Sequence, residues 1–271
     1  MAYFQLNDGT GYQMNYETYS GLVPQNTLFI HGNLASNRWW YPALEVWQQK
    51  AKGKNLQGSL IFAEFRGCGK SSAPQAVTEM NMKNLAKDFI SLIEDQKLAP
   101  VNLVGHSTGG LIVSLMLSMR PDLFSKAVLL DPVGAKGVTF DETMDAAFEA
   151  MKNDRGIVSA VMGGTIYNND PSTDFFNQVV VPDAHHAVKT IGMWVLQNLK
   201  GLDIQEDVKK ISTPTLVLHG EHDLLLPIQD SKELANLMKN GQFKVVEGQG
   251  HCTNAENPSK FVRIASDFLF A

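Results

Sequence analysis

The sharpest chemical signal in the sequence is the serine at the centre of residues 105–109, Gly-His-Ser-Thr-Gly. An apolar run that predicts a buried strand, Val101–Val104, precedes this segment, and a helical pattern, Leu111–Arg120, follows it. A G-x-S-x-G segment between a strand and a helix forms a strained turn that projects the serine hydroxyl, and its glycines let strand and helix approach closely. We therefore predict that Ser107 is a nucleophile.

A serine hydroxyl needs a base within hydrogen-bonding reach, and the chain offers seven histidines for this role. Six are poorly placed, because they end predicted strands, lie inside the serine turn or a predicted insertion, or adjoin the acid candidate: His31, His219, His106, His185, His186 and His222. His251 instead follows the last predicted strand in a glycine-rich loop, at the sheet edge where Ser107 also emerges. Catalytic groups of open α/β sheets gather at that edge, so we predict that His251 is the base.

A carboxylate must fix the tautomer of that base and stabilise its protonated form. Asp223 lies just past a predicted strand and gives the chain order serine, aspartate, histidine. Glu221 is two positions earlier in the same turn, where its side chain points elsewhere. Asp131 is the stronger rival, since it also ends a predicted strand, although its side chain could instead cap backbone amides where the insertion starts at Pro132. We predict Asp223 as the acid and keep Asp131 as the alternative.

The tetrahedral intermediate of acyl transfer also needs donors for its oxyanion. The amide of Thr108, at the start of the predicted helix, supplies the first donor with the help of the helix dipole. The loop after strand Thr27–His31 contains a glycine that lets the backbone approach the site. We assign the second donor to the amide of Asn33 in this loop, with Leu34 as the less favoured choice.

Short apolar runs that predict buried strands alternate with amphipathic helical segments through most of the chain. The predicted strands are Thr27–His31, Ser59–Phe65, Val101–Val104, Ala127–Leu130, Thr215–His219 and Phe243–Val246. This alternation predicts an α/β fold, a mostly parallel sheet flanked by helices. Tyr3–Leu6 and Tyr12–Tyr19, joined by Asn7-Asp8-Gly9, predict an antiparallel hairpin at the edge of the sheet.

Residues 132–210 interrupt the alternation, since they contain helical patterns and no convincing strand. We expect them to form a helical cap over one end of the sheet, and residues 1–131 and 211–271 to form the core. Several large apolar residues of the cap are candidates to line a pocket: Met144, Phe148, Met151, Met162, Phe175, Phe176, Met193 and Trp194.

Composition narrows the classes of function. Apolar residues make up 44% and charged residues 19% of the chain, and the net charge of −5 without a Lys/Arg cluster argues against a nucleic-acid partner. Cys68 and Cys252 form neither a disulfide framework nor a zinc site, and no phosphate-binding loop is present, so we expect no cofactor and no metal. We find no secretion signal and no apolar run long enough for stable membrane insertion, so we expect a cytoplasmic location. The sequence does not indicate an oligomeric state.

Four blocks in order resemble the α/β-hydrolase family, in particular its small capped carboxylesterases, cofactor-free haloperoxidases and carbon–carbon bond hydrolases. The blocks are His31–Ser36, Arg66–Ser71, Gly105–Gly109, and Gly220–Asp223 with Gly250-His251 and Glu256–Pro258. The resemblance covers nearly the whole chain apart from the cap, which is typically variable. It implies an eight-stranded sheet, a helical lid after the sixth strand, a structural turn at the second block, and the triad Ser107, Asp223 and His251. The family often carries aspartate where this chain has Glu64.

An intact triad and an apolar cap predict a serine hydrolase that cleaves small or medium carboxylic esters through an acyl-enzyme on Ser107. We expect four residues to contact the ester: Leu34, Phe148, Met162 and Trp194. The alternatives are a lactonase or a carbon–carbon bond hydrolase with the same triad, or a receptor-type member that binds its ligand and turns it over slowly. A serine nucleophile argues against the related dehalogenases and epoxide hydrolases, whose nucleophile is aspartate.

Overall fold

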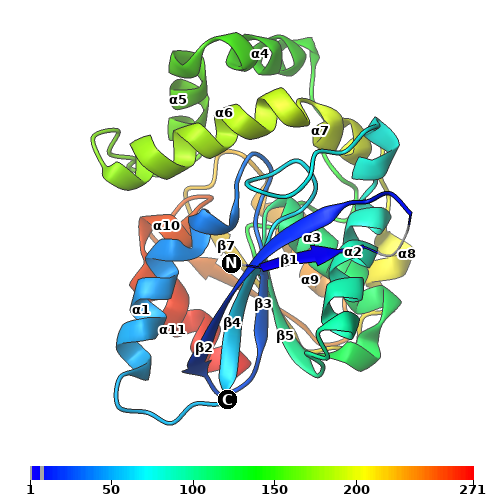
Figure 1. The fold of residues 1–271 in the computed structure, drawn as a ribbon, viewed down its shortest axis with the longest axis vertical. Helices are drawn as coiled ribbons and strands as arrows, with labels where there is room; N and C mark the ends of the chain where they lie inside the picture. Colours follow the sequence, from blue (N-terminus) through cyan, green and yellow to red (C-terminus); the bar gives the residue numbers. More distant parts are fainter. Residues whose placement is uncertain (1, 7–8) are drawn as a thin grey trace.

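The computed structural model describes residues 2–6 and 9–271, which form an eight-stranded sheet (Figure 1). The strands are β1 Ala2–Gln5, β2 Gln13–Val23, β3 Thr27–Ile30, β4 Gly58–Ala63, β5 Val101–His106, β6 Phe124–Leu130, β7 Thr215–Gly220 and β8 Gly241–Val246. Their order across the sheet is β1-β2-β4-β3-β5-β6-β7-β8. β2 pairs antiparallel with β1 and with β4, and every other neighbouring pair is parallel. The predicted α/β class and the mostly parallel sheet are confirmed.

The predicted hairpin forms the edge of this sheet. β1 pairs with the first half of β2, with Phe4 opposite Met14. Two of the residues predicted to connect the strands, Asn7 and Asp8, lie outside the described residues. β2 runs on past the predicted end at Tyr19, and its second half pairs with β4.

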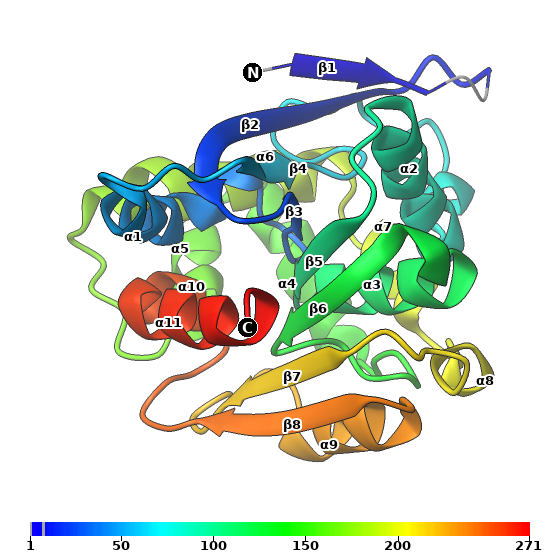
Figure 2. The ribbon, with the colours of Figure 1, turned by 90° about the horizontal axis from the view of Figure 1, so that it is seen from below.

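Helices cover both faces of the sheet (Figure 2). One face carries α1 (Tyr41–Ala51) and α11 (Pro258–Leu269), and the other carries α2 (Met82–Asp95), α3 (Thr108–Met119) and α9 (Ile228–Leu237). Side chains alternate along a strand, so Phe29 of β3 packs in the core with α1 and α11, whereas Leu28 and Ile30 enter the opposite core. This burial on both sides explains why the strands are almost continuously apolar in sequence.

The chain between β6 and β7 forms a helical layer over one end of the sheet (Figure 1). Its helices are α4 Glu142–Asn153, α5 Arg155–Gly164, α6 Val181–Thr190 and α7 Trp194–Leu199, with a π-helical turn, Phe176–Val180, before α6. Within this described stretch the one strand-like pairing is an isolated bridge between Val138 and Lys200. The chain then returns to the core through α8 (Gln205–Val208), which packs against α3 and α9.

The remaining helical elements are short. They are α10 Thr253–Glu256 and the 3₁₀ turns Asn37–Trp40, Val77–Met80 and Pro121–Leu123. None of the described helices combines the length and the apolar character that a membrane span requires.

Candidate active site

Ser107 occupies the turn between β5 and α3 with φ of 53° and ψ of −120°, a conformation that non-glycine residues rarely adopt. Its amide donates a hydrogen bond of 2.9 Å to the carbonyl oxygen of Leu130 on the neighbouring strand. A Cβ on Gly105 would lie 2.5 Å from Gly109 O, and one on Gly109 would lie 2.4 Å from Ile30 O. Glycine is therefore required at both positions, and the strained strand–turn–helix geometry predicted around Ser107 is present.

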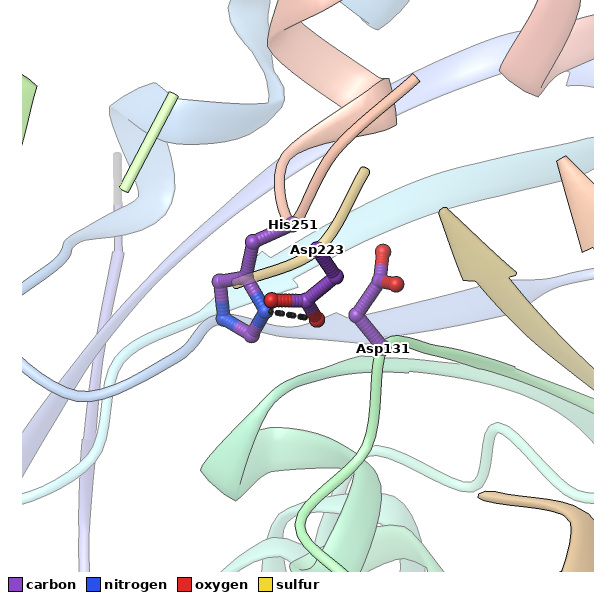
Figure 3. A group of neighbouring side chains, drawn as sticks. All are labelled: Asp131, Asp223 and His251. Atoms are coloured by element: carbon purple, nitrogen blue, oxygen red, sulfur yellow. Dashed lines mark hydrogen bonds and ion pairs between the residues drawn. The ribbon is translucent and has the colours of Figure 1, made fainter. Parts of the chain in front are cut away.

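His251 and Asp223 are joined by a hydrogen bond of 2.8 Å, in which His251 Nδ1 donates to Asp223 Oδ2 (Figure 3). They follow β8 and β7, which are parallel neighbours, so both side chains emerge at one sheet edge. Asp223 Oδ1 accepts two further amides, Leu225 N at 2.7 Å and Leu226 N at 3.2 Å. Burial raises the pKa of Asp223, but the hydrogen bonds from His251 and from these amides outweigh it and hold that pKa below its ordinary value. Asp223 is therefore a charged partner for the imidazole at neutral pH.

A cavity of about 460 Å³ opens beside these side chains. Ser107 and His251 line it from the core, and residues of α4, α5 and α7 line it from the insertion. Asn33 and Thr108, the predicted oxyanion donors, line it as well. A Cβ on Gly32 would lie 3.1 Å from Ser107 Cβ, so the loop after β3 passes directly against the nucleophile.

Three of the residues predicted to contact the substrate line this cavity: Leu34, Phe148 and Met162. The fourth, Trp194, is not among the described lining residues and packs, half-buried, against the hydrophobic core. Trp194 opens α7, and it is Leu196 of the same helix that lines the cavity. Residues two positions apart point to nearly opposite sides of a helix. The prediction that Trp194 lines the cavity is therefore corrected, because α7 presents Leu196 to it.

One wall of the cavity was missed in the sequence. It is formed by the three consecutive leucines that follow the acid, Leu224, Leu225 and Leu226. An apolar run inside a loop at the catalytic edge was the available signal. Of the other apolar candidates in the insertion, Met144 lines the cavity, and the described lining does not include Met151, Phe175, Phe176 or Met193. The described lining residues also include no Asp, Glu, Lys or Arg, so the cavity offers a substrate no fixed charge.

Residues 28–258 match the family described as alpha/beta hydrolase fold. The chain belongs to the alpha/beta hydrolase family. The matched stretch runs from β3 to the first residue of α11 and contains Ser107, Asp223 and His251. The protein is thus a hydrolase of this fold, as the ordered sequence blocks indicated.

Proteins similar to this hydrolase cover most or all of its length. The esterase from Exiguobacterium antarcticum is 21% identical with a TM-score of 0.84 and covers 99% of both chains. The bromoperoxidase from Bacillus anthracis is 22% identical with a TM-score of 0.84 and covers 100% of this chain and 99% of its own. The provisionally named carbamate hydrolase RutD of Pseudomonas savastanoi pv. phaseolicola is 22% identical over 231 residues, 83% of this chain and 88% of that protein. These names describe different reactions, so the reaction of this hydrolase must be argued from its own site.

Asp131, the rival acid, is fully buried beside Asp223 in this hydrolase (Figure 3). Its Oδ1 accepts Gly220 N of β7 at 2.7 Å. The sequence had suggested that Asp131 caps an amide of the insertion, whereas the amide that it caps belongs to the sheet. Burial, and then the charge of Asp223, raise the pKa of Asp131 well above its ordinary value, so this carboxyl group holds its proton more tightly than a free aspartate.

Asp131, Asp223 and His251 also offer ligand atoms within 4.8 Å of one another, a spacing at which side chains could hold a metal ion. The 2.8 Å hydrogen bond between His251 and Asp223 accounts for their contact without one. The arrangement therefore fits an acid–base pair with a second carboxyl group of raised pKa beside it.

His106, set aside as a base, contacts His251. Its Nε2 donates to the carbonyl oxygen of His251 at 2.9 Å, and the two ring centroids lie 4.8 Å apart. Burial chiefly, and then the nearby His251, lower the pKa of His106 to about 3, so its ring is neutral. Sequence reasoning missed this contact because its partners are 145 residues apart and no local pattern marks it.

Proposed function

We propose that this hydrolase cleaves small or medium, uncharged carboxylic esters through an acyl-enzyme on Ser107. The observation that carries the proposal is that Ser107 and His251 line one apolar cavity and that His251 is hydrogen-bonded to Asp223. Acyl transfer by serine requires a nucleophile, a base and an orienting carboxylate in this relation.

In the acylation step, His251 Nε2 accepts the proton of Ser107 Oγ as that oxygen bonds to the carbonyl carbon of the ester. The carbonyl oxygen takes up the negative charge, and the amides of Asn33 and Thr108 donate hydrogen bonds to it. The bond to the alcohol then breaks, and the alcohol leaves with the proton from His251. In the second half, water gives a proton to His251 and attacks the acyl carbon, and Ser107 regains its proton as the acid departs. Asp223 stays ionised and stabilises the imidazolium that forms in both halves.

The cavity supports this substrate class. Its volume of about 460 Å³ suits a small or medium ligand, and its apolar lining suits an alkyl or aryl group. A charged acyl group would be buried there without a partner among the described lining residues, which is energetically costly. The similarity to an esterase is consistent with this choice. The proposal includes a core of residues 1–131 and 211–271 and a cap of residues 132–210, whose helices enclose the acyl group.

The test is a panel of chromogenic esters, lactones and vinylogous diketones at one enzyme concentration, measured beside Ser107→Ala. We expect the fastest turnover on esters with short acyl chains and its loss in the variant. Lactones or diketones that are turned over faster than every ester would contradict the substrate class. A variant that keeps the wild-type rate would contradict the serine mechanism.

A further inference from the structure

The loop that carries His251 is held by Glu256, at the end of α10. Glu256 Oε2 accepts Gly250 N at 2.6 Å, and Glu256 Oε1 accepts Cys252 N at 3.0 Å. These amides stand immediately before and after His251, so one carboxylate fixes the backbone on both sides of the base. Hydrogen bonds to a carboxylate are roughly twice as strong as those between neutral groups.

The same carboxylate also binds the helical insertion. Glu256 Oε1 accepts a third amide, Tyr167 N, at 3.0 Å. The backbones approach closely here, because a Cβ on Gly250 would lie 2.6 Å from Tyr167 Cβ. The insertion and the loop of the base therefore meet without room for another side chain between them.

Two further contacts bind the insertion to the catalytic loops. Cys252 Sγ donates to the carbonyl oxygen of Thr165 at 3.4 Å. The ring of Tyr167 stacks on the ring of His222, in the loop of the acid, with centroids 4.3 Å apart and planes at 25°. The segment after α5 thus touches both the loop that carries the base and the loop that carries the acid.

We propose that Glu256 is a positioning residue that seats His251 and latches the insertion to the loop of the base. The inference rests on the proposed function, since it takes His251 as the base. Because one carboxylate binds two amides of that loop and one of the insertion, a displacement of the insertion is transmitted to the backbone beside His251. A misplacement of about 1 Å in a catalytic group costs about 10²-fold in rate. The base is therefore competent only while the insertion is seated.

Glu256→Gln tests the latch, with Glu221→Gln as a matched control. Glutamine presents one oxygen, so at least one of the three amides loses its acceptor. Glu221 also accepts an amide of this loop, Gly248 N at 2.8 Å, but that amide does not adjoin His251. We expect kcat for p-nitrophenyl acetate to fall about 10- to 100-fold in Glu256→Gln, with KM changed less than about threefold. The control should lose less than about threefold in kcat.

Thermal midpoints of both variants are measured as well, since a loss of loop stability alone would affect both. Equal losses of kcat in the two variants, or a higher KM at unchanged kcat in Glu256→Gln, would overturn the latch. Fluorophosphonate labelling distinguishes a failure of the proposed function from a failure of the latch. A wild-type protein that is not labelled at Ser107 overturns the proposed function, whereas labelling at Ser107 with equal losses overturns the latch alone.

Gly250→Ala tests the same contact if Glu256→Gln does not fold. It keeps all three amide donors but forces a Cβ against Tyr167. We expect Gly250→Ala to lose kcat to a similar extent. In the double variant Gly250→Ala/Tyr167→Gly the opposing Cβ is absent, so kcat should recover to that of Tyr167→Gly. Wild-type kcat in Gly250→Ala overturns the coupling.

Discussion

Asp223→Asn is the substitution whose effect the geometry specifies most closely. Asp223 Oδ1 accepts two backbone amides, from Leu225 and Leu226, so the oxygen of an asparagine would stay at that position. The NH₂ group would then take the place of Oδ2, which lies 2.8 Å from His251 Nδ1. An NH₂ group can only donate, so Nδ1 must become the acceptor and the ring proton must move to Nε2.

A proton on Nε2 disables the base, because that nitrogen must receive the proton of Ser107. The loss expected for the wrong tautomer is about 10⁴-fold in kcat, which corresponds to about 5.4 kcal/mol of transition-state stabilisation at 1.36 kcal/mol per decade. The volume and shape of the side chain are unchanged, so KM and the thermal midpoint should stay close to those of the wild-type protein.

Asp131→Asn is the matched comparison. Asp131 has a φ of 43°, which asparagine tolerates well, and its amide oxygen can still accept Gly220 N. It replaces a carboxyl group whose raised pKa favours the uncharged form, so kcat should change less than about tenfold, or 1.4 kcal/mol. Both variants are assayed on one p-nitrophenyl ester. If Asp131→Asn is inactive and Asp223→Asn is active, the acid is Asp131 and the tautomer argument is wrong.

Four other outcomes are expected. A fluorophosphonate probe should label the protein once, at Ser107, and Ser107→Ala should lose labelling and about 10⁴-fold in kcat; labelling that persists would exclude this nucleophile. Short-chain p-nitrophenyl esters should be cleaved faster than long-chain ones, because the cavity holds about 460 Å³; rates that climb steadily with chain length, or jump above the critical micelle concentration, would contradict the compact cap. His106→Phe removes the donor to the His251 carbonyl and should lower kcat about tenfold, whereas His106→Gln can still donate and should lose less; equal rates in the two variants would show that this hydrogen bond does not matter. Because the raised pKa of Asp131 makes the folded state hold that proton more tightly, the free energy of unfolding falls as pH rises above the unfolded value of about 3.9. Asp131→Asn lacks this loss, so its thermal midpoint should rise relative to that of the wild-type protein between pH 4 and pH 8; a midpoint that falls relative to the wild type over this range would contradict the raised pKa of Asp131.

The nucleophile turn and the positions of the strands along the chain could be predicted from the sequence because both are marked by local signals. A glycine two residues to either side of Ser107 is needed because Gly105 packs against the start of α3 and Gly109 against the end of β3, and this requirement leaves a pattern in five consecutive residues. Buried parallel strands are likewise marked by short apolar runs. Once the strands were placed, the common edge of the sheet brought His251 and Asp223 together as expected.

The parts that were not predicted depend on contacts between distant segments. Trp194 was chosen for its size, but the rotation of α7 that presents Leu196 to the cavity depends on how the helix packs. The contact of Glu256 with Tyr167 joins residues 89 positions apart, and neither residue type marks it. A backbone donor also leaves no mark in a sequence, because every residue except proline carries one.

The hydrogen-bond donors around the two neighbouring carboxyl groups differ, and so do the directions in which their pKa values are shifted. Asp223 receives His251 Nδ1 and two amides, whereas Asp131 receives the amide of Gly220 and leaves Oδ2 buried without a partner among the described residues. Burial, and then the charge of Asp223, raise the pKa of Asp131, which is the group with fewer donors. The lowered pKa of Asp223 therefore follows from its hydrogen bond with His251 and from the turn after β7, which aims two amides at its carboxylate. A change in that turn that removed those amides would reduce the difference between the pKa values of the two carboxyl groups, although neither aspartate would be replaced.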